Sequence, residues 1–178
     1  MTARICLLRG VNVGGVKVTM AELKALASAL GWGNPRTLLA SGNLVLDHDG
    51  EPAAMAQALE GALEAHFKRR IEVIVRTPEA WSGLMAANPF TNEALIDPSR
   101  LLVQVMKDKS LDGACEALRA FAQADEAVAE VEGALFMWCP NGIGSSLMAE
   151  KAAPRLIGTA TARNWNTIVK LGALAGCI

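Results

Sequence analysis

RICLLRGVNVGGVKVTMAELKALASALG, residues 4–31, contains a short apolar run, a glycine-rich loop and an amphipathic pattern in that order. The apolar run at residues 4–9 predicts a short buried strand. The glycines at 10–15 favour a loop, because glycine adopts backbone conformations that other residues avoid. Thr19 and Glu22 then have the spacing of a capping box, and apolar residues recur at helical spacing after them. The stretch therefore predicts a strand, a loop and a helix.

Three more elements complete the pattern of the first half. The extended stretches 36–40 and 43–47 are separated by two residues, so they form either a hairpin or one bulged strand. Pro52 can open a helix whose apolar stripe ends at Phe67, and residues 71–76 predict another strand. The order β-α-β-β-α-β is that of a ferredoxin-like half, in which two helices cover one face of an antiparallel sheet.

The second half begins with the same pattern. Residues 101–106 predict an apolar strand, a helix capped by Ser110 follows, and two strands near 127–131 and 134–139 flank a tight turn. Beyond Gly144, the pattern predicts helices where the first half has a helix and a strand. The first half of the chain is therefore repeated in architecture, but not to its end.

The C-terminal segment predicts two helices, at 146–157 and 162–175, with Thr161 as the N-cap of the second. We therefore expect an α+β protein with two ferredoxin-like (split β-α-β) halves, the second ending in extra C-terminal helices. The expected domain organisation is a first subdomain, a connector and a second subdomain with the C-terminal helices, at 1–87, 88–100 and 101–178.

Composition limits the possible classes of protein. The 178 residues are 52% hydrophobic and carry a net charge of -1, which suits a packed globular protein and does not favour nucleic-acid binding. The four cysteines lack CxxC spacing and lie among apolar residues, which indicates reduced thiols. Near the N-terminus the apolar run is too short for a signal peptide or a membrane span. We expect a cytoplasmic protein that does not enter the membrane; its oligomeric state stays open.

The glycine loop is the first candidate for a binding site. It lies between a strand and the N-terminus of a helix, where backbone N–H groups and the helix dipole favour an anion. It is not a P-loop, because Gly15, Val16 and Lys17 stand where that motif requires GK[ST]. The alternative is that the glycines only permit a tight turn.

Polar residues elsewhere could complete this site. Some lie at the ends of neighbouring predicted strands, and others start the predicted terminal helix; if the two groups meet, they form a cleft rich in hydrogen-bond donors. The alternative is that Arg163 and Asn164 brace the two halves, with Trp165 as a core anchor. The candidate ligand-binding residues are Arg9, Asn12, Gly14, Gly15, Asn43, Arg163, Asn164 and Asn166.

Other kinds of site have weaker support in the sequence. His48 and His66 lack the spacing of metal ligands, and no serine lies in a GxSxG motif, so catalytic residues stay unknown and no metal or cofactor is expected. RNA-recognition domains of the ferredoxin-like type stack bases on sheet aromatics, and those aromatics are missing here. The basic run at 68–70 is explained by its position at a helix C-terminus.

Several motifs together resemble the bacterial domain-of-unknown-function 1697 family. They run along the whole chain and include LLRGVNVGG (7–15), MAELKAL (20–26), ASGNLVL (40–46), NPF (88–90), DPSRLLVQVM (97–106), PNGIGSSL (140–147) and ATARNWNTIVKL (160–171). The resemblance implies a two-part ferredoxin-like architecture and brings no activity. Our leading hypothesis is a protein that binds a small anionic ligand, such as a phosphate ester, nucleotide or carboxylate, between the glycine loop and the C-terminal helix. The alternative is a protein- or RNA-interaction module without catalytic activity; whether the chain is an enzyme stays open.

Overall fold

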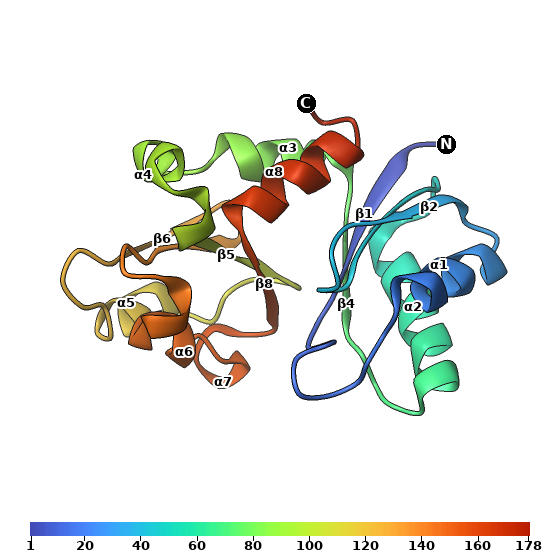
Figure 1. The fold of residues 1–178 in the computed structure, drawn as a ribbon, viewed down its shortest axis with the longest axis horizontal. Helices are drawn as coiled ribbons and strands as arrows, with labels where there is room; N and C mark the ends of the chain where they lie inside the picture. The colour runs from blue at the N-terminus through green and yellow to red at the C-terminus, as the bar shows by residue number, and fades with distance from the viewer. The chain divides into compact units, whose positions relative to one another are not determined.

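The computed structural model describes all residues, 1–178 (Figure 1). Its contacts divide the chain into two compact units, which we call unit 1 and unit 2. Unit 1 contains Met1–Ser82 and Leu171–Ile178, and unit 2 contains Gly83–Lys170. The division points fall within α3 (Pro78–Ala86) and α8 (Trp165–Leu174). The subdomain boundaries expected from the sequence stay a prediction.

Unit 1 is built on a four-stranded antiparallel sheet with the strand order β2-β3-β1-β4. Helices α1 and α2 lie on one face of this sheet (Figure 1). The strands are β1 (Ala3–Leu8), β2 (Gly33–Thr37), β3 (Asn43–Asp47) and β4 (Val73–Arg76), and the helices are α1 (Met20–Ala29) and α2 (Pro52–Phe67). This is the strand order of the predicted ferredoxin-like half.

The β2–β3 pair resolves the choice between a hairpin and a single bulged strand. The two strands pair antiparallel, with an irregularity in register between Gly33 and Arg36. However, β2 ends at Thr37, whereas the sequence predicted an extended stretch at 36–40. The chain turns sooner because Leu39 adopts a left-handed conformation, with φ 57°. The sequence gives no glycine or asparagine at that position to indicate such a turn.

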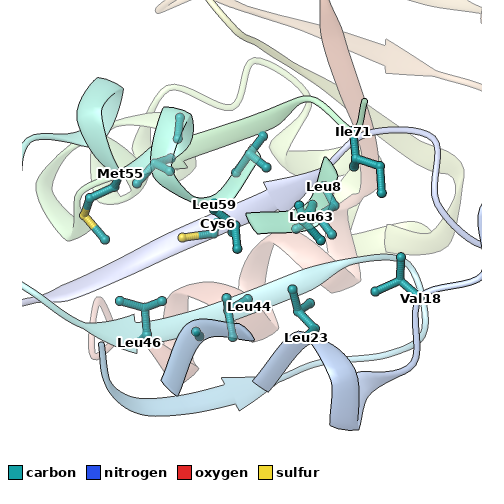
Figure 2. Close-up of a cluster of buried hydrophobic side chains, with 14 of the residues drawn as sticks. Cys6, Leu8, Val18, Leu23, Leu44, Leu46, Met55, Leu59, Leu63 and Ile71 are labelled. Atoms are coloured by element: carbon teal, nitrogen blue, oxygen red, sulfur yellow. The ribbon is translucent and has the colours of Figure 1, made fainter. Parts of the chain in front are cut away.

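The core of unit 1 lies between the sheet and its two helices. Leu8 from β1 and Leu44 from β3 meet Leu23 of α1 and Leu59 of α2, all at most 1% exposed (Figure 2). Burial of one such side chain stabilises a fold by about 1.5–3 kcal/mol. Residues on the opposite face of the same strands, including Ile5 and Leu7, are also buried. Because β1 and β3 are buried on both faces, their apolar residues follow one another without alternating with polar residues.

Unit 2 contains a second four-stranded antiparallel sheet, with the strand order β6-β7-β5-β8. With β5 matched to β1 and β8 to β4, this order is the same as in unit 1. The strands are β5 (Leu101–Met106), β6 (Ala127–Val131), β7 (Ala134–Trp138) and β8 (Ala160–Asn164), and the helices are α4 (Thr91–Ile96), α5 (Ala114–Arg119), α6 (Leu147–Lys151) and α7 (Pro154–Ile157), with short 3-10 turns at Pro98–Arg100 and Ile143–Ser145. The predicted α+β fold with two similar halves and C-terminal helices is therefore confirmed.

The prediction of a helix at 162–175 capped by Thr161 was wrong at its start. Residues 160–164 form β8, which pairs with β5 from Leu102↔Asn164 to Met106↔Ala160. Helix α8 begins at Trp165, and Asn164 caps it by accepting a 3.0 Å hydrogen bond from the Thr167 N–H. The fourth strand makes the second half match the first in element order, which the sequence analysis missed.

Two smaller features also differ from the sequence predictions. Ser110 does not cap α5, which begins after Gly113; the Ser110 hydroxyl instead donates to the Glu130 carboxylate. The expected helix at 146–157 is two short helices, α6 and α7, because Pro154 disfavours helical conformation in the residue before it. The predicted connector contains α4.

None of the helices combines the length and apolarity needed to cross a bilayer.

Candidate ligand-binding pocket

A pocket of about 430 Å³ lies in unit 1, where the loop after β1 leads into α1. That volume is within the range of roughly 300–1,000 Å³ found for small-molecule sites. The loop, the start of α1 and the turn between β2 and β3 all contribute to its wall. The lining residues are Asn12, Gly14, Gly15, Lys17, Val18, Thr19, Met20 and Ala40. The structure thus brings three of the predicted site residues, Asn12, Gly14 and Gly15, to one pocket.

The glycines of the loop have different structural needs. Gly10 and Gly14 have φ values of 67° and 64°, a region that costs other residues roughly 1–2 kcal/mol. Gly15 lies outside that region, and an added Cβ would meet only the carbonyl oxygens of Gly10 and Val13, at 3.7 and 3.9 Å. These are ordinary contact distances. The requirement for a tight turn therefore explains Gly10 and Gly14, but it does not explain Gly15.

Asn12 holds the loop in shape. Its side-chain amide donates to the Val18 carbonyl over 2.9 Å and to the Ala40 carbonyl, and its Oδ1 accepts a 2.9 Å hydrogen bond from the Val18 N–H. Both amide hydrogens and the carbonyl oxygen are thus engaged with backbone. Asn12 also has φ 58°, which asparagine tolerates better than most residues. Its side chain therefore ties the glycine loop to the β2–β3 turn and fixes the pocket wall.

The N-terminus of α1 carries the predicted capping box. The Thr19 N–H and hydroxyl donate to Glu22 Oε2 over 3.0 and 2.8 Å, and the Glu22 N–H donates back to Thr19 Oγ1 over 3.1 Å. The hydrogen bonds from Thr19, with a smaller contribution from His66, lower the pKa of the Glu22 carboxyl. Glu22 is therefore a carboxylate at neutral pH. Lys17 is the basic residue among those that line the pocket, and it is exposed to solvent.

Arg9 and Asn43, also in unit 1, are not among the pocket-lining residues. The Arg9 guanidinium forms an ion pair with Glu72 over 3.4 Å, and the Arg9 backbone N–H donates to the Glu72 carbonyl. Asn43 is fully buried, and its side-chain amide donates to the Leu38 carbonyl and the Ser41 hydroxyl, both over 2.8 Å. Asn43 thus organises the turn that precedes β3.

The other three predicted site residues belong to unit 2. Arg163 is 7% exposed within β8, where its guanidinium donates to Thr161 Oγ1 over 2.7 Å and to the Ala162 carbonyl over 2.8 Å. Burial lowers the pKa of Arg163 to about 10, so it still carries a charge at neutral pH. Asn164 caps α8, and Asn166 is exposed in its first turn. Arg163 and Asn164 therefore precede the helix that they were expected to open.

Five residues that line the pocket were not among the predicted site residues. They are Lys17, Val18, Thr19, Met20 and Ala40. Lys17 could have been found, because it is a cation two residues before a helix N-cap. Thr19 was recognised only as a cap. No sequence signal marked Ala40, because it lies beside the loop only in the folded chain. There its carbonyl accepts a hydrogen bond from the Asn12 side chain.

Comparisons with known proteins agree with this architecture. The chain is similar over 99% of its length, and over 99% of the other chain, to the solved structure of the conserved bacterial protein SP0830 from Streptococcus pneumoniae, with a TM-score of 0.79 and 21% sequence identity. At that identity the likeness concerns the fold. No curated protein matches the chain. A family model described as "Protein of unknown function (DUF1697)" matches residues 1–136. This match confirms the resemblance seen in the sequence motifs, and the chain belongs to the DUF1697 family of proteins of unknown function.

Proposed function

We propose that the pocket of unit 1 binds a small organic anion, such as a phosphate ester, nucleotide or carboxylate. The observation that carries this proposal is the combination of residues in one pocket of about 430 Å³: a glycine loop, the start of a helix and a lysine. Backbone N–H groups at a helix N-terminus favour an anion, and an ammonium group adds a direct charge partner. The alternative, a protein- or RNA-interaction module, stays a prediction.

Each part of the pocket has a distinct role in this proposal. The Lys17 ammonium pairs with the negative charge of the ligand, while the loop backbone approaches the ligand closely at Gly15, where no Cβ is present. Gly14 and Asn12 keep the loop in its left-handed conformation and do not need to touch the ligand. Gly15 supports this assignment because its backbone conformation and surroundings would accept alanine. A ligand that approaches the backbone is a physical reason for glycine there.

A thermal-shift screen tests the proposal. A ligand at 100 times its Kd stabilises the folded state by about 2.7 kcal/mol. For a protein of this size, that corresponds to a rise in Tm of roughly 5–11 °C. The screen would contain inorganic phosphate, aliphatic and aromatic carboxylates, sugar phosphates and nucleotides. A rise in Tm with at least one organic anion supports the proposal, and no shift with any of them contradicts it.

Charge-matched variants then locate the binding site. Lys17→Ala removes the lysine of the pocket, whereas Lys24→Ala removes an exposed lysine that is not among the lining residues. Both variants lose one positive charge, so a general electrostatic effect would weaken binding equally in both. We expect the loss of affinity only in Lys17→Ala. Gly15→Ala should leave the Tm within about 2 °C, since its Cβ meets no close contact, and should still weaken binding.

A further inference from the structure

We infer that the ligand of this pocket is an amphipathic monoanion: one carboxylate or comparable single charge on an apolar body of several carbon atoms. The inference rests on the proposed function and narrows it to one chemical class. It depends on three properties of the pocket, namely its volume, the chemistry of its wall and its charge.

The volume exceeds what a bare anion can fill. About 430 Å³ is within the size range of sites that hold whole small organic molecules, roughly 300–1,000 Å³. An acetate or inorganic phosphate ion has only a few heavy atoms and would leave most of that space to water. Small-molecule sites generally bury most of the surface of their ligand. The remaining space therefore fits an organic body attached to the charged group.

The wall offers that body few polar partners. Met20 is half-buried at the start of α1 and presents a flexible thioether chain, Ala40 contributes a methyl group, and the methylene stem of Lys17 adds further apolar surface. The polar atoms of Asn12 are already bonded to backbone groups of the loop and the turn. No aromatic side chain lines the pocket, so a nucleobase would find no stacking partner there. This lining suits an aliphatic body better than a base or a sugar.

The charges near the pocket favour one negative charge on the ligand. Lys17 is the lining cation, while the Glu22 carboxylate already occupies part of the helix N-terminus through its bonds with Thr19. A second or third negative charge would find no further lysine or arginine among the lining residues to pair with. The di- and triphosphate groups of nucleotides are therefore disfavoured relative to a monocarboxylate.

Calorimetric titrations with a homologous series of acetate, butanoate, hexanoate and octanoate test the inference, with inorganic phosphate and ADP as comparators. Each fully buried methylene should tighten binding by up to about fourfold until the pocket is full. We expect hexanoate to bind at least tenfold more tightly than acetate and more tightly than ADP. Equal affinity along the series, or tighter binding of ADP, would overturn the inference.

Two variants separate this inference from the proposed function. Met20→Ala should reduce the gain from acetate to hexanoate, whereas Leu95→Ala, which trims an apolar side chain that is 86% exposed in unit 2, should leave it unchanged. Binding of all anions that depends on Lys17 but not on chain length would preserve the proposed function and contradict the inference. Absence of binding by every anion, phosphate included, would contradict both. Equal effects of the two apolar variants would also count against the amphipathic ligand.

Discussion

Replacement of Asn12 tests whether this residue braces the glycine loop. Two of its three side-chain hydrogen bonds are partly buried, and the one to the Ala40 carbonyl is exposed. At about 1 kcal/mol for each partly buried bond and less for the exposed one, Asn12→Gly should destabilise the loop by about 2 kcal/mol. Glycine keeps the φ of 58° without strain, so in the folded state this variant removes the hydrogen bonds and adds no backbone strain. Asn12→Ala should cost about 1 kcal/mol more, because alanine is strained in the left-handed region.

Hydrogen exchange at the Val18 amide measures this effect directly, since that N–H donates to Asn12 Oδ1. A loss of about 2 kcal/mol corresponds to exchange roughly 30-fold faster in Asn12→Gly. Asn12→Asp is the informative companion variant: it keeps the acceptor for the Val18 N–H but places a carboxylate oxygen against two carbonyl oxygens. It should be at least as destabilised as Asn12→Gly. Unchanged exchange at Val18 in the glycine variant would refute the bracing role of Asn12.

Three further predictions concern the fold. Gly42→Ala should destabilise the protein by about 2–4 kcal/mol in chemical denaturation, because φ is 78° there and the added Cβ would lie 2.7 Å from Val11 Cγ2. The control Gly31→Ala has a similar φ of 77° but open space around the added Cβ, so it should cost only about 1–2 kcal/mol. Leu59→Ala should cost about 2–5 kcal/mol, since Leu59 is fully buried between α2 and the sheet; a cost under 1 kcal/mol would contradict the described core. Burial raises the pKa of the Cys6 thiol to about 12, so the unfolded chain loses the thiol proton from about pH 9 while the folded protein keeps it. The free energy of unfolding should therefore fall as the pH rises from about 9 to about 12, and Cys6→Ala should make that decline less steep.

The elements that the sequence predicted correctly carry strong local signals. The capping box of Thr19 and Glu22 fixed the start of α1, and the turn at Glu132 and Gly133 adopts positive φ at both residues, as a tight hairpin requires. Strand β8 had no comparable signal. Its sequence, ATARN, lacks a run of β-branched or aromatic residues, and it forms a strand because β5 offers a neighbouring edge with which it pairs. Long-range pairing of this kind cannot be recognised from local residue pattern.

The candidate site was predictable only in part, for a similar reason. The glycine loop could be predicted because Gly10, Gly14 and Gly15 lie between a predicted strand and a predicted helix. The roles of the asparagines could not be predicted, because an asparagine side chain can bind a ligand or form hydrogen bonds with backbone groups. Only the hydrogen-bond partners in the folded structure distinguish these two roles. Asn12 and Asn43 both bond to nearby backbone, and Asn164 caps a helix. The sequence therefore did not indicate the backbone partners of these asparagines, and it did not single out Lys17, which lines the pocket.

A two-dimensional amide NMR titration with hexanoate tests the proposed pocket most directly. We expect saturable shifts concentrated at the amides of Gly14, Gly15, Lys17 and Met20, retained in Lys24→Ala and lost in Lys17→Ala. Shifts confined to other residues, or saturable shifts at these amides that persist undiminished in Lys17→Ala, would contradict a lysine-dependent anion site at the glycine loop.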